Sequence, residues 1–235
     1  LAHRLTNLIK QDLFRDGALE VVCVNAGNSI QDANTLTEYS RTYDNIRVYD
    51  TLRDPLYHSW NIGIQHARGE YITNANADDR LAPFATRKLA EALDNGADVA
   101  YGSCYCTVTR NAEWSGEWDF FLDDPINYHD GKVPFGHEPF DPDRLARQCF
   151  IGPFPMWRKA LHDRVGYFDS AFAIAGDYEM WLRFAAHGAT FQNIPLYLGL
   201  FYFADTQLSQ SSHEQLMMEN RLCRLRWQSK IIAEV

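Results

Sequence analysis

The first 110 residues predict an α/β fold with a mainly parallel sheet flanked by helices. Short apolar runs, each with the length of a buried strand, alternate with segments of helical periodicity. Turn-forming or polar residues follow these runs and separate them from the next element. This rhythm is typical of a sheet that helices cover on both faces. The predicted strands are residues 20–24, 46–49, 71–73 and 99–101.

Helices are predicted between and after those strands. Apolar residues recur at helical spacing from Leu1 to Ile9. Residues 57–67 also have a helical pattern, and Gly69 follows them as a common helix stop. Pro83 favours the start of a further helix, because its fixed φ angle suits a first turn. Three more helices are predicted later in the chain, over 156–165, over 178–187 and from a capping box at 211–214 to about residue 233.

Length and charge restrict the possible classes of protein. A chain of 235 residues is long enough for one domain with one sizeable core. The net charge of −9 disfavours nucleic acid as a partner, because affinity for phosphate backbones comes mainly from Lys and Arg. Residues 111–150 alone carry a net charge of −6, are rich in aromatic residues and lack periodicity. We predict a functional loop or small lobe there.

The sequence also bears on location. The chain has no apolar run of the roughly 18 residues that cross a bilayer, so we expect no transmembrane segment. Leu1-Ala2-His3-Arg4 does not read as a signal peptide. The five cysteines are odd in number, and Cys104 and Cys106 are expected to share one face of a strand as small apolar side chains. Reduced thiols favour a cytoplasmic protein, in solution or at the inner face of a membrane.

Two adjacent carboxylates follow the third predicted strand. In open α/β sheets, ligands bind at the carboxyl ends of parallel strands, and Asp78 and Asp79 lie just after residues 71–73. Mg²⁺ and Mn²⁺ prefer oxygen ligands of this kind. The pattern predicts a divalent metal site that bridges to the phosphates of a nucleotide. A turn or helix cap before Pro83 would also explain the pair.

Longer motifs around this pair resemble glycosyltransferase family 2, which has the GT-A fold. Residues 60–72 read WNIGIQHARGEYI and lead to NADDRLAP at 76–83. These are similar to the family's Asn-x-Gly, Ala-x-Gly-Glu-Tyr-Ile, Asp-x-Asp-Asp and Pro pattern. A second block, GYFD at 166–169 followed by GDYEMWLR at 176–183, resembles a later family motif. The resemblance covers about residues 1–110 and 150–210.

The resemblance implies a function and a set of site residues. Members of the family transfer a sugar from a nucleoside diphosphate sugar to a hydroxyl group, often on a glycan in polysaccharide or cell-envelope synthesis. By this resemblance Asp177 is the catalytic base of an inverting reaction, and Asp78 and Asp79 hold Mn²⁺ or Mg²⁺. The donor-binding residues that it implies are Asn25, Asn61, Asn76 and Asp78.

The resemblance also implies three parts for the one domain. Residues 1–110 become the nucleotide-sugar-binding half, 111–150 an acceptor-side lobe, and 151–235 the half with the catalytic base and the last helix.

Three departures from the family pattern stand out. Asn76 replaces the first Asp of Asp-x-Asp, and Asn25 stands where an Asp usually meets the nucleotide base. An amide donates as well as accepts, so the base preference can differ. The family's first strand is absent, and Leu1 reads as part of the helix that should follow it. We therefore expect the natural protein to have further residues before Leu1, which would cover an otherwise unpaired edge beside Val21–Val24.

Other residues have two interpretations each. His213 is interpreted as a helix-start residue, with metal ligation as the alternative. Glu179 is interpreted as a charge in the first turn of a helix, where the helix dipole favours it. Trp114, Trp118 and Trp157 are predicted to serve in packing, although an aromatic ring can also stack on a sugar.

Two further functions remain as alternatives. The first is a nucleotide-sugar-binding domain with impaired catalysis, which the missing strand, Ala26 and Asn76 favour. The second is a nucleotidyltransferase, which would share the metal, the nucleotide and the sheet. That class requires a Gly-rich basic phosphate loop near the start, and the sequence has none there.

Overall fold

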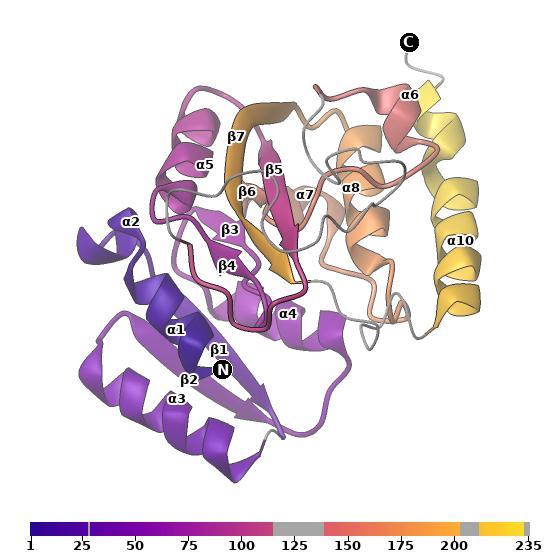
Figure 1. The fold of residues 1–235 in the computed structure, drawn as a ribbon. Coiled ribbons are helices and arrows are strands. Elements are labelled where there is room, and N and C mark those ends of the chain that lie inside the picture. Colours follow the sequence, from indigo (N-terminus) through magenta and orange to yellow (C-terminus); the bar gives the residue numbers. More distant parts are fainter. Residues whose placement is uncertain (28, 115–138, 203–211, 233–235) are drawn as a thin grey trace.

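A computed structural model describes residues 1–235 except for 28, 115–138, 203–211 and 233–235 (Figure 1). Trp118 and most of the predicted lobe at 111–150 lie outside the described residues, as does Ser211 of the predicted capping box. The described helices are α1 (Ala2–Ile9), α2 (Asp12–Arg15), α3 (Ile30–Thr42), α4 (Leu56–His66), α5 (Ala85–Asp94), α6 (Pro142–Leu145), α7 (Leu161–Val165), α8 (Gly176–Ala186) and α10 (His213–Ile232). The described strands are β1 (Val21–Ala26), β2 (Ile46–Thr51), β3 (Tyr71–Thr73), β4 (Arg80–Leu81), β5 (Val99–Thr107), β6 (Met156–Arg158) and β7 (Phe191–Tyr202).

The strands form two sheets in the described part of the chain. β1 and β2 pair in parallel, and the second sheet has the order β3-β6-β5-β7-β4. In that second sheet β5 and β7 are parallel, whereas β6 is antiparallel to β3 and β5, and β4 is antiparallel to β7. The predicted α/β fold with flanking helices is confirmed. Its strand directions are mixed rather than mainly parallel, because β6 inserts between two strands that were expected to pair with parallel neighbours.

One predicted helix is partly wrong, because its first residues form strand β6. Residues 156–165 were expected to be helical, but Met156–Arg158 is strand β6 and only Leu161–Val165 is helix α7. Side chains alternate between the two faces of a strand. Met156 packs into one hydrophobic cluster and Trp157 into the other, which is the arrangement of a central strand covered on both faces.

The central sheet divides the core into two hydrophobic clusters. Val99 and Tyr101 of β5 belong to the cluster under α8, whereas Ala100 and Cys104 belong to the cluster under α5. Figure 1 shows α5 on one side of the sheet and α8 with α10 on the other. Cys104 is buried and Cys106 partly exposed, and all five cysteines are free thiols.

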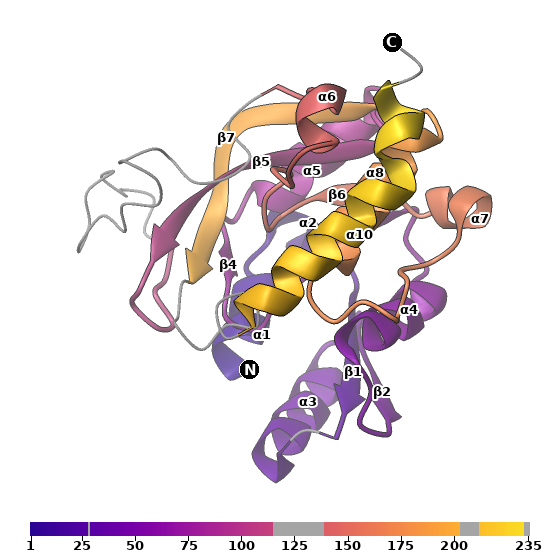
Figure 2. The ribbon, with the colours of Figure 1, turned by 90° about the vertical axis from the view of Figure 1, so that its right-hand side faces the viewer.

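The last helix lies along α8. Figure 2 shows α10 in yellow, next to α8 and α6. His213 is its exposed first residue, which confirms the interpretation as a helix-start residue. Among the helices described, none has the length and apolar character needed to span a membrane.

Candidate active site

The loop after β3 separates the two adjacent carboxylates. Asp78 is exposed to solvent, whereas Asp79 is only 1% exposed. One carboxylate oxygen of Asp79 accepts a hydrogen bond from the Asn76 amide at 2.9 Å. The other accepts from the backbone N–H of Tyr202 at the end of β7, at 3.0 Å. Asp79 therefore anchors the loop to the sheet, and Asp78 is the member of the pair that faces solvent.

Burial also changes the acidity of Asp79. Desolvation raises the pKa of its carboxyl group to about 6, against the hydrogen bonds from Asn76 and Tyr202, which favour the charged form. The nearby charge of Asp78 adds to the increase. An anion at this depth needs partners, because an unpaired buried charge is costly.

Two buried arginines supply positive charge beside Asp79. The carbonyl oxygen of Asp79 accepts from Nη1 of Arg4 at 3.1 Å and from Nη1 of Arg80 at 2.6 Å. Burial lowers the pKa of Arg4 to about 10 and also lowers that of Arg80, while Asp79 opposes both shifts. The two guanidinium groups therefore bind the backbone of the loop at Asp79.

Asn25 is the penultimate residue of β1 and lies beside Asp50 of β2. Parallel pairing places these two residues opposite each other, and the Asn25 amide donates to Asp50 Oδ1 at 2.6 Å. Both side chains therefore stand near the carboxyl ends of parallel strands, where this fold class binds ligands. Asp50 is a neighbour that the sequence interpretation did not single out.

Asn61 has a structural use in α4. Its amide nitrogen donates to the Phe168 carbonyl oxygen at 2.8 Å, and its Oδ1 accepts from the Phe168 N–H at 2.9 Å. This pair of hydrogen bonds joins α4 to the chain that leads toward α8. Both polar ends of the amide therefore serve the protein backbone, and the donor-binding role that the family resemblance implies for Asn61 stays a prediction.

Asp177 lies in the first turn of α8 and is partly exposed. Its Oδ1 accepts from the Tyr178 N–H at 2.7 Å and lies 3.4 Å from the hydroxyl oxygen of Tyr57. The Tyr57 hydroxyl donates to the Ile174 carbonyl oxygen at 2.6 Å. Burial raises the pKa of Asp177 above its ordinary value, although these hydrogen bonds oppose the increase. A carboxylate with a raised pKa is a stronger proton acceptor.

The remaining candidates have packing roles. Trp157 is buried, contacts Trp181 and Phe168 edge-on, and donates its indole N–H to His162. Trp114 packs against Phe84 and the sheet. These contacts confirm the predicted packing role of both tryptophans.

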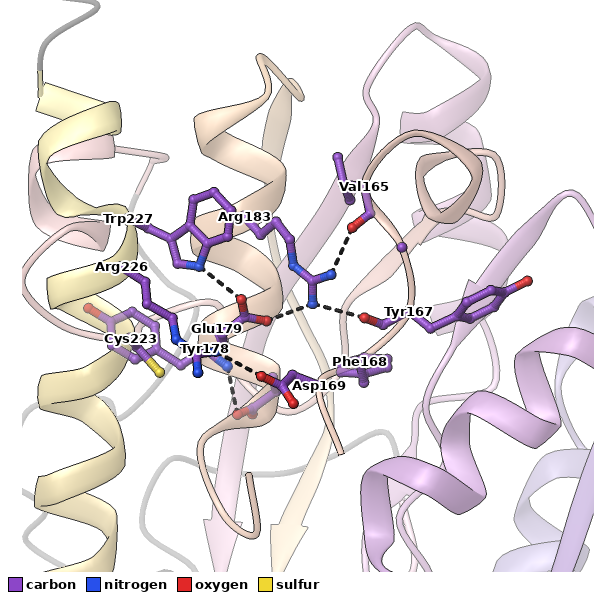
Figure 3. A network of polar contacts seen from close by, with 12 residues as sticks. Val165, Tyr167, Phe168, Asp169, Tyr178, Glu179, Arg183, Cys223, Arg226 and Trp227 are labelled. Carbon is purple, nitrogen blue, oxygen red and sulfur yellow. Dashed lines mark hydrogen bonds and ion pairs between the residues drawn. The ribbon is translucent and has the colours of Figure 1, made fainter. Parts of the chain in front are cut away.

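Glu179 is in the first turn of α8, as interpreted, but the sequence did not show that it is buried. It accepts hydrogen bonds from Arg183 and Trp227 (Figure 3).

The protein alone does not enclose a metal ion within the described residues. There, no group of three or more His, Cys, Asp or Glu side chains gathers. Asp78 offers an exposed carboxylate on an anchored loop. Mg²⁺ is commonly held by one or two carboxylates together with substrate phosphates, so this loop fits a cation that arrives with a nucleotide.

Comparison with known proteins decides the family. Residues 1–165 match the family described as Glycosyl transferase family 2. The chain belongs to glycosyl transferase family 2. YwdF of Bacillus subtilis (strain 168), described as an uncharacterized glycosyltransferase, is 24% identical over 152 residues, which are 65% of this chain and 52% of the relative. The chain thus spans about half the length of this curated relative.

Solved structures share the GT-A fold with this family 2 chain. S. aureus TarS 1–349 superposes with a TM-score of 0.67 at 16% identity, over 97% of this chain and 65% of TarS 1–349. The same fragment in complex with UDP-GlcNAc gives 0.65 at 18% identity, over 86% and 54%. The mannosyltransferase PcManGT from Pyrobaculum calidifontis, in complex with GDP-Man and Mn²⁺, gives 0.63 at 16% identity, over 99% and 59%.

Proposed function

We propose that this chain transfers a sugar from a nucleoside diphosphate sugar to a hydroxyl group, with inversion and with the help of a divalent cation. The observation that carries the proposal is Asp177, a partly exposed carboxylate with a raised pKa at the start of α8 in a family 2 chain. A glycan is the acceptor that the family resemblance favours.

Asp177 would act as the base. A sugar hydroxyl is a poor nucleophile at neutral pH, and a carboxylate that accepts its proton during attack contributes typically about 10²- to 10⁴-fold. Direct attack opposite the leaving diphosphate inverts the anomeric carbon and requires one such carboxylate. The Tyr178 N–H and the packing of Tyr57 hold Asp177 in place, which favours a fixed direction of proton transfer.

The loop after β3 would bind the donor. Asp78 is proposed as the cation ligand, with Asp79 and Asn76 as the residues that fix the loop beneath it. A bound Mn²⁺ or Mg²⁺ supplies positive charge to the departing diphosphate. Asn25 and Asn76 are proposed to meet the nucleoside, since amides can hydrogen-bond a base or a ribose hydroxyl. PcManGT with GDP-Man and Mn²⁺, and TarS with UDP-GlcNAc, support this class of donor.

A donor screen tests the proposal. UDP-GlcNAc, UDP-glucose and GDP-mannose are each incubated with the protein and Mn²⁺, Mg²⁺ or EDTA, and the released nucleotide is identified by chromatography. We expect UDP or GDP, released only with a divalent cation. In a parallel incubation with a nucleoside triphosphate and a sugar 1-phosphate, release of pyrophosphate would indicate a nucleotidyltransferase instead.

One observation favours a second function, which is donor binding without turnover. Asn76 stands where the family pattern has a carboxylate, and its amide is bound to Asp79. An amide is a weaker ligand for hard cations than a carboxylate. Calorimetric binding of a nucleotide sugar in the presence of Mn²⁺, without release of nucleotide when acceptor mixtures are added, would support this alternative.

A further inference from the structure

One face of α10 carries polar contacts to the segment around Asp177. Glu219, Cys223 and Trp227 are spaced four residues apart, so they lie along one side of the helix. Cys223 is buried, and its thiol lies 3.6 Å from the Ala175 carbonyl oxygen. Trp227 donates to Glu179 at 2.8 Å. Figure 3 shows Trp227 reaching from α10 toward Glu179 and Arg183 on α8.

Glu219 makes the most extensive of these contacts. Its Oε2 accepts from the backbone N–H groups of Ile174 at 2.9 Å and Ala175 at 2.8 Å. Its Oε1 accepts from the Ala173 N–H at 3.1 Å and from the Gln215 amide at 2.9 Å. The residue is only 4% exposed. One side chain thus binds three consecutive backbone amides just before α8.

These contacts keep Glu219 charged. Burial alone would raise its pKa, but the amides of Ala175, Ile174 and Ala173 outweigh that effect and lower it. Hydrogen bonds to a charged group are shorter and roughly twice as strong as neutral ones. Replacement of the carboxylate would leave buried backbone donors without a partner.

The bound segment leads directly to the proposed base. Asp177 follows Ala175 by two residues. In addition, the Tyr57 hydroxyl of α4 donates to the Ile174 carbonyl oxygen. The peptide groups around Ile174 therefore donate their N–H groups to Glu219 of α10, and the Ile174 carbonyl oxygen accepts from Tyr57 of α4.

We propose that Glu219 is a positioning residue for Asp177, which acts by fixing the backbone of residues 173–175. This inference rests on the proposed role of Asp177 as base. The carboxylate of a base must stay within hydrogen-bond reach of the attacking hydroxyl, and a misplacement of about 1 Å can cost on the order of 100-fold in rate. The last helix thereby becomes part of the catalytic half.

The test compares Glu219→Gln with Glu214→Gln, a matched control that removes a charge from an exposed position in the first turn of the same helix. The donor with the fastest release in the screen above is the substrate. For Glu219→Gln we expect kcat to fall at least about 10-fold while KM for the donor changes less than about 2-fold. Glu214→Gln should leave both unchanged. Asp177→Asn is measured in parallel.

The outcomes separate the two proposals. If Asp177→Asn loses turnover while Glu219→Gln keeps the wild-type kcat, the positioning role is overturned and the base remains. If Asp177→Asn keeps full turnover, the assigned base is wrong and the positioning role fails with it. A parallel increase of KM and loss of kcat in Glu219→Gln would indicate general damage to the fold and would also overturn the proposal.

A second measurement does not depend on turnover. Hydrogen exchange of the peptide that covers residues 173–177 should become at least about 10-fold faster in Glu219→Gln than in Glu214→Gln, because glutamine offers one uncharged acceptor oxygen to amides that now share two charged ones. Equal exchange in the two variants would contradict the anchoring. If Glu219→Gln does not fold, Glu219→Asp replaces it in both measurements. It keeps the charge but is one methylene too short to bridge all three amides, so the same two results are expected and the same two results would overturn the proposal.

Discussion

Gly176 lies so close to the ring of Tyr57 that a Cβ atom on it would be 2.6 Å from the ring carbon Cε2. Tyr57 is buried in α4, and its hydroxyl donates to Ile174, two residues before Gly176. The ring and the hydroxyl of one side chain therefore both fix the start of α8. Absence of a side chain at residue 176 is what allows α4 to approach the helix that carries Asp177.

Two glycine-to-alanine substitutions, one at this contact and one within α4, should have opposite effects on stability. Gly176→Ala places a methyl group in steric overlap with the Tyr57 ring, and overpacking of this kind costs about 1–3 kcal/mol. At Gly63, within α4, an added Cβ would meet Val24 at an ordinary 3.6 Å. Gly63→Ala should stabilise the protein by about 0.5–1 kcal/mol, because alanine is the better helix former. Thermal unfolding of both variants and the wild type measures the difference, and a stable Gly176→Ala would show that α4 and α8 can separate without cost.

The sequence predicted the elements better than their pairing. Strand and helix positions follow from local periodicity, and the segments around Val21, Ile46 and Tyr71 are strands as expected. Strand direction depends on contacts between distant segments. Residues 156–158 gave only three positions of alternation before a helix, too few to distinguish a central strand from a helix start.

Metal binding should distinguish Asp78 from Asp79. Mn²⁺ and UDP together should stabilise the wild type by about 2.7 kcal/mol at a ligand concentration of 100 times Kd. Asp78→Ala should lose the metal-dependent part of that shift and keep the stability of the ligand-free protein, because the side chain is exposed. Asp79→Ala should destabilise the ligand-free protein by about 1–3 kcal/mol, since the Tyr202 N–H and the Asn76 amide lose their acceptor.

Melting scans with and without Mn²⁺ and UDP measure both effects. An equal metal-dependent shift in wild type and Asp78→Ala would exclude Asp78 from the cation site. Unchanged melting of ligand-free Asp79→Ala would show that the carboxylate does not anchor the loop.

The candidate site was predictable where a residue stands in a recognisable motif or directly after a predicted strand. Asp78, Asp79 and Asp177 stand in long family-like blocks, so their importance was visible in the sequence. Tyr57 and Glu219 lie outside those blocks, and they come near Asp177 only because α4 and α10 pack around the start of α8. Asn61 shows the opposite case. It stands in a motif, but the fold uses its amide to bind the Phe168 backbone.

His162 should make stability depend on pH. The Trp157 indole N–H donates to its Nε2 at 2.8 Å, so Nδ1 carries the proton and donates to the Gly166 carbonyl oxygen. Burial lowers the pKa of His162 below its ordinary value of 6.5. Between the lowered pKa and 6.5 the unfolded chain binds more protons than the folded one, so the free energy of unfolding rises with pH through this window. The stabilisation is complete above the unfolded pKa and is lost as pH falls.

Urea unfolding of wild type and His162→Gln from pH 7.5 down to pH 5 checks this. The wild type should lose more stability over that range than the variant, which cannot titrate at this position. Parallel curves for the two proteins would mean that His162 keeps its ordinary pKa in the fold.

The final prediction concerns the rate of sugar transfer and Asp177. Asp177→Asn retains a side chain that can accept from the Tyr178 N–H but removes the proton acceptor, so kcat should fall about 10²- to 10⁴-fold. Donor affinity should remain, because the donor is proposed to bind at the loop after β3. Melting should change little, since Asn can still accept from the Tyr178 N–H, and even full loss of a helix-start contact costs only about 1 kcal/mol. Calorimetry with UDP and Mn²⁺, together with a melting scan, provides the controls.

The pH profile adds a second readout of the same residue. Burial raises the pKa of Asp177, and the ionisable groups that face it are Tyr57, Cys149, Cys223 and Glu219. A base must be ionised to accept a proton, so wild-type kcat should fall as the pH decreases. The apparent pKa of this decline should lie above the ordinary Asp value of about 3.9. In Asp177→Asn the residual rate should lack that decline. A variant that folds, binds UDP and still transfers sugar at the wild-type rate would exclude Asp177 as the base, and the search would move to other carboxylates near the start of α8.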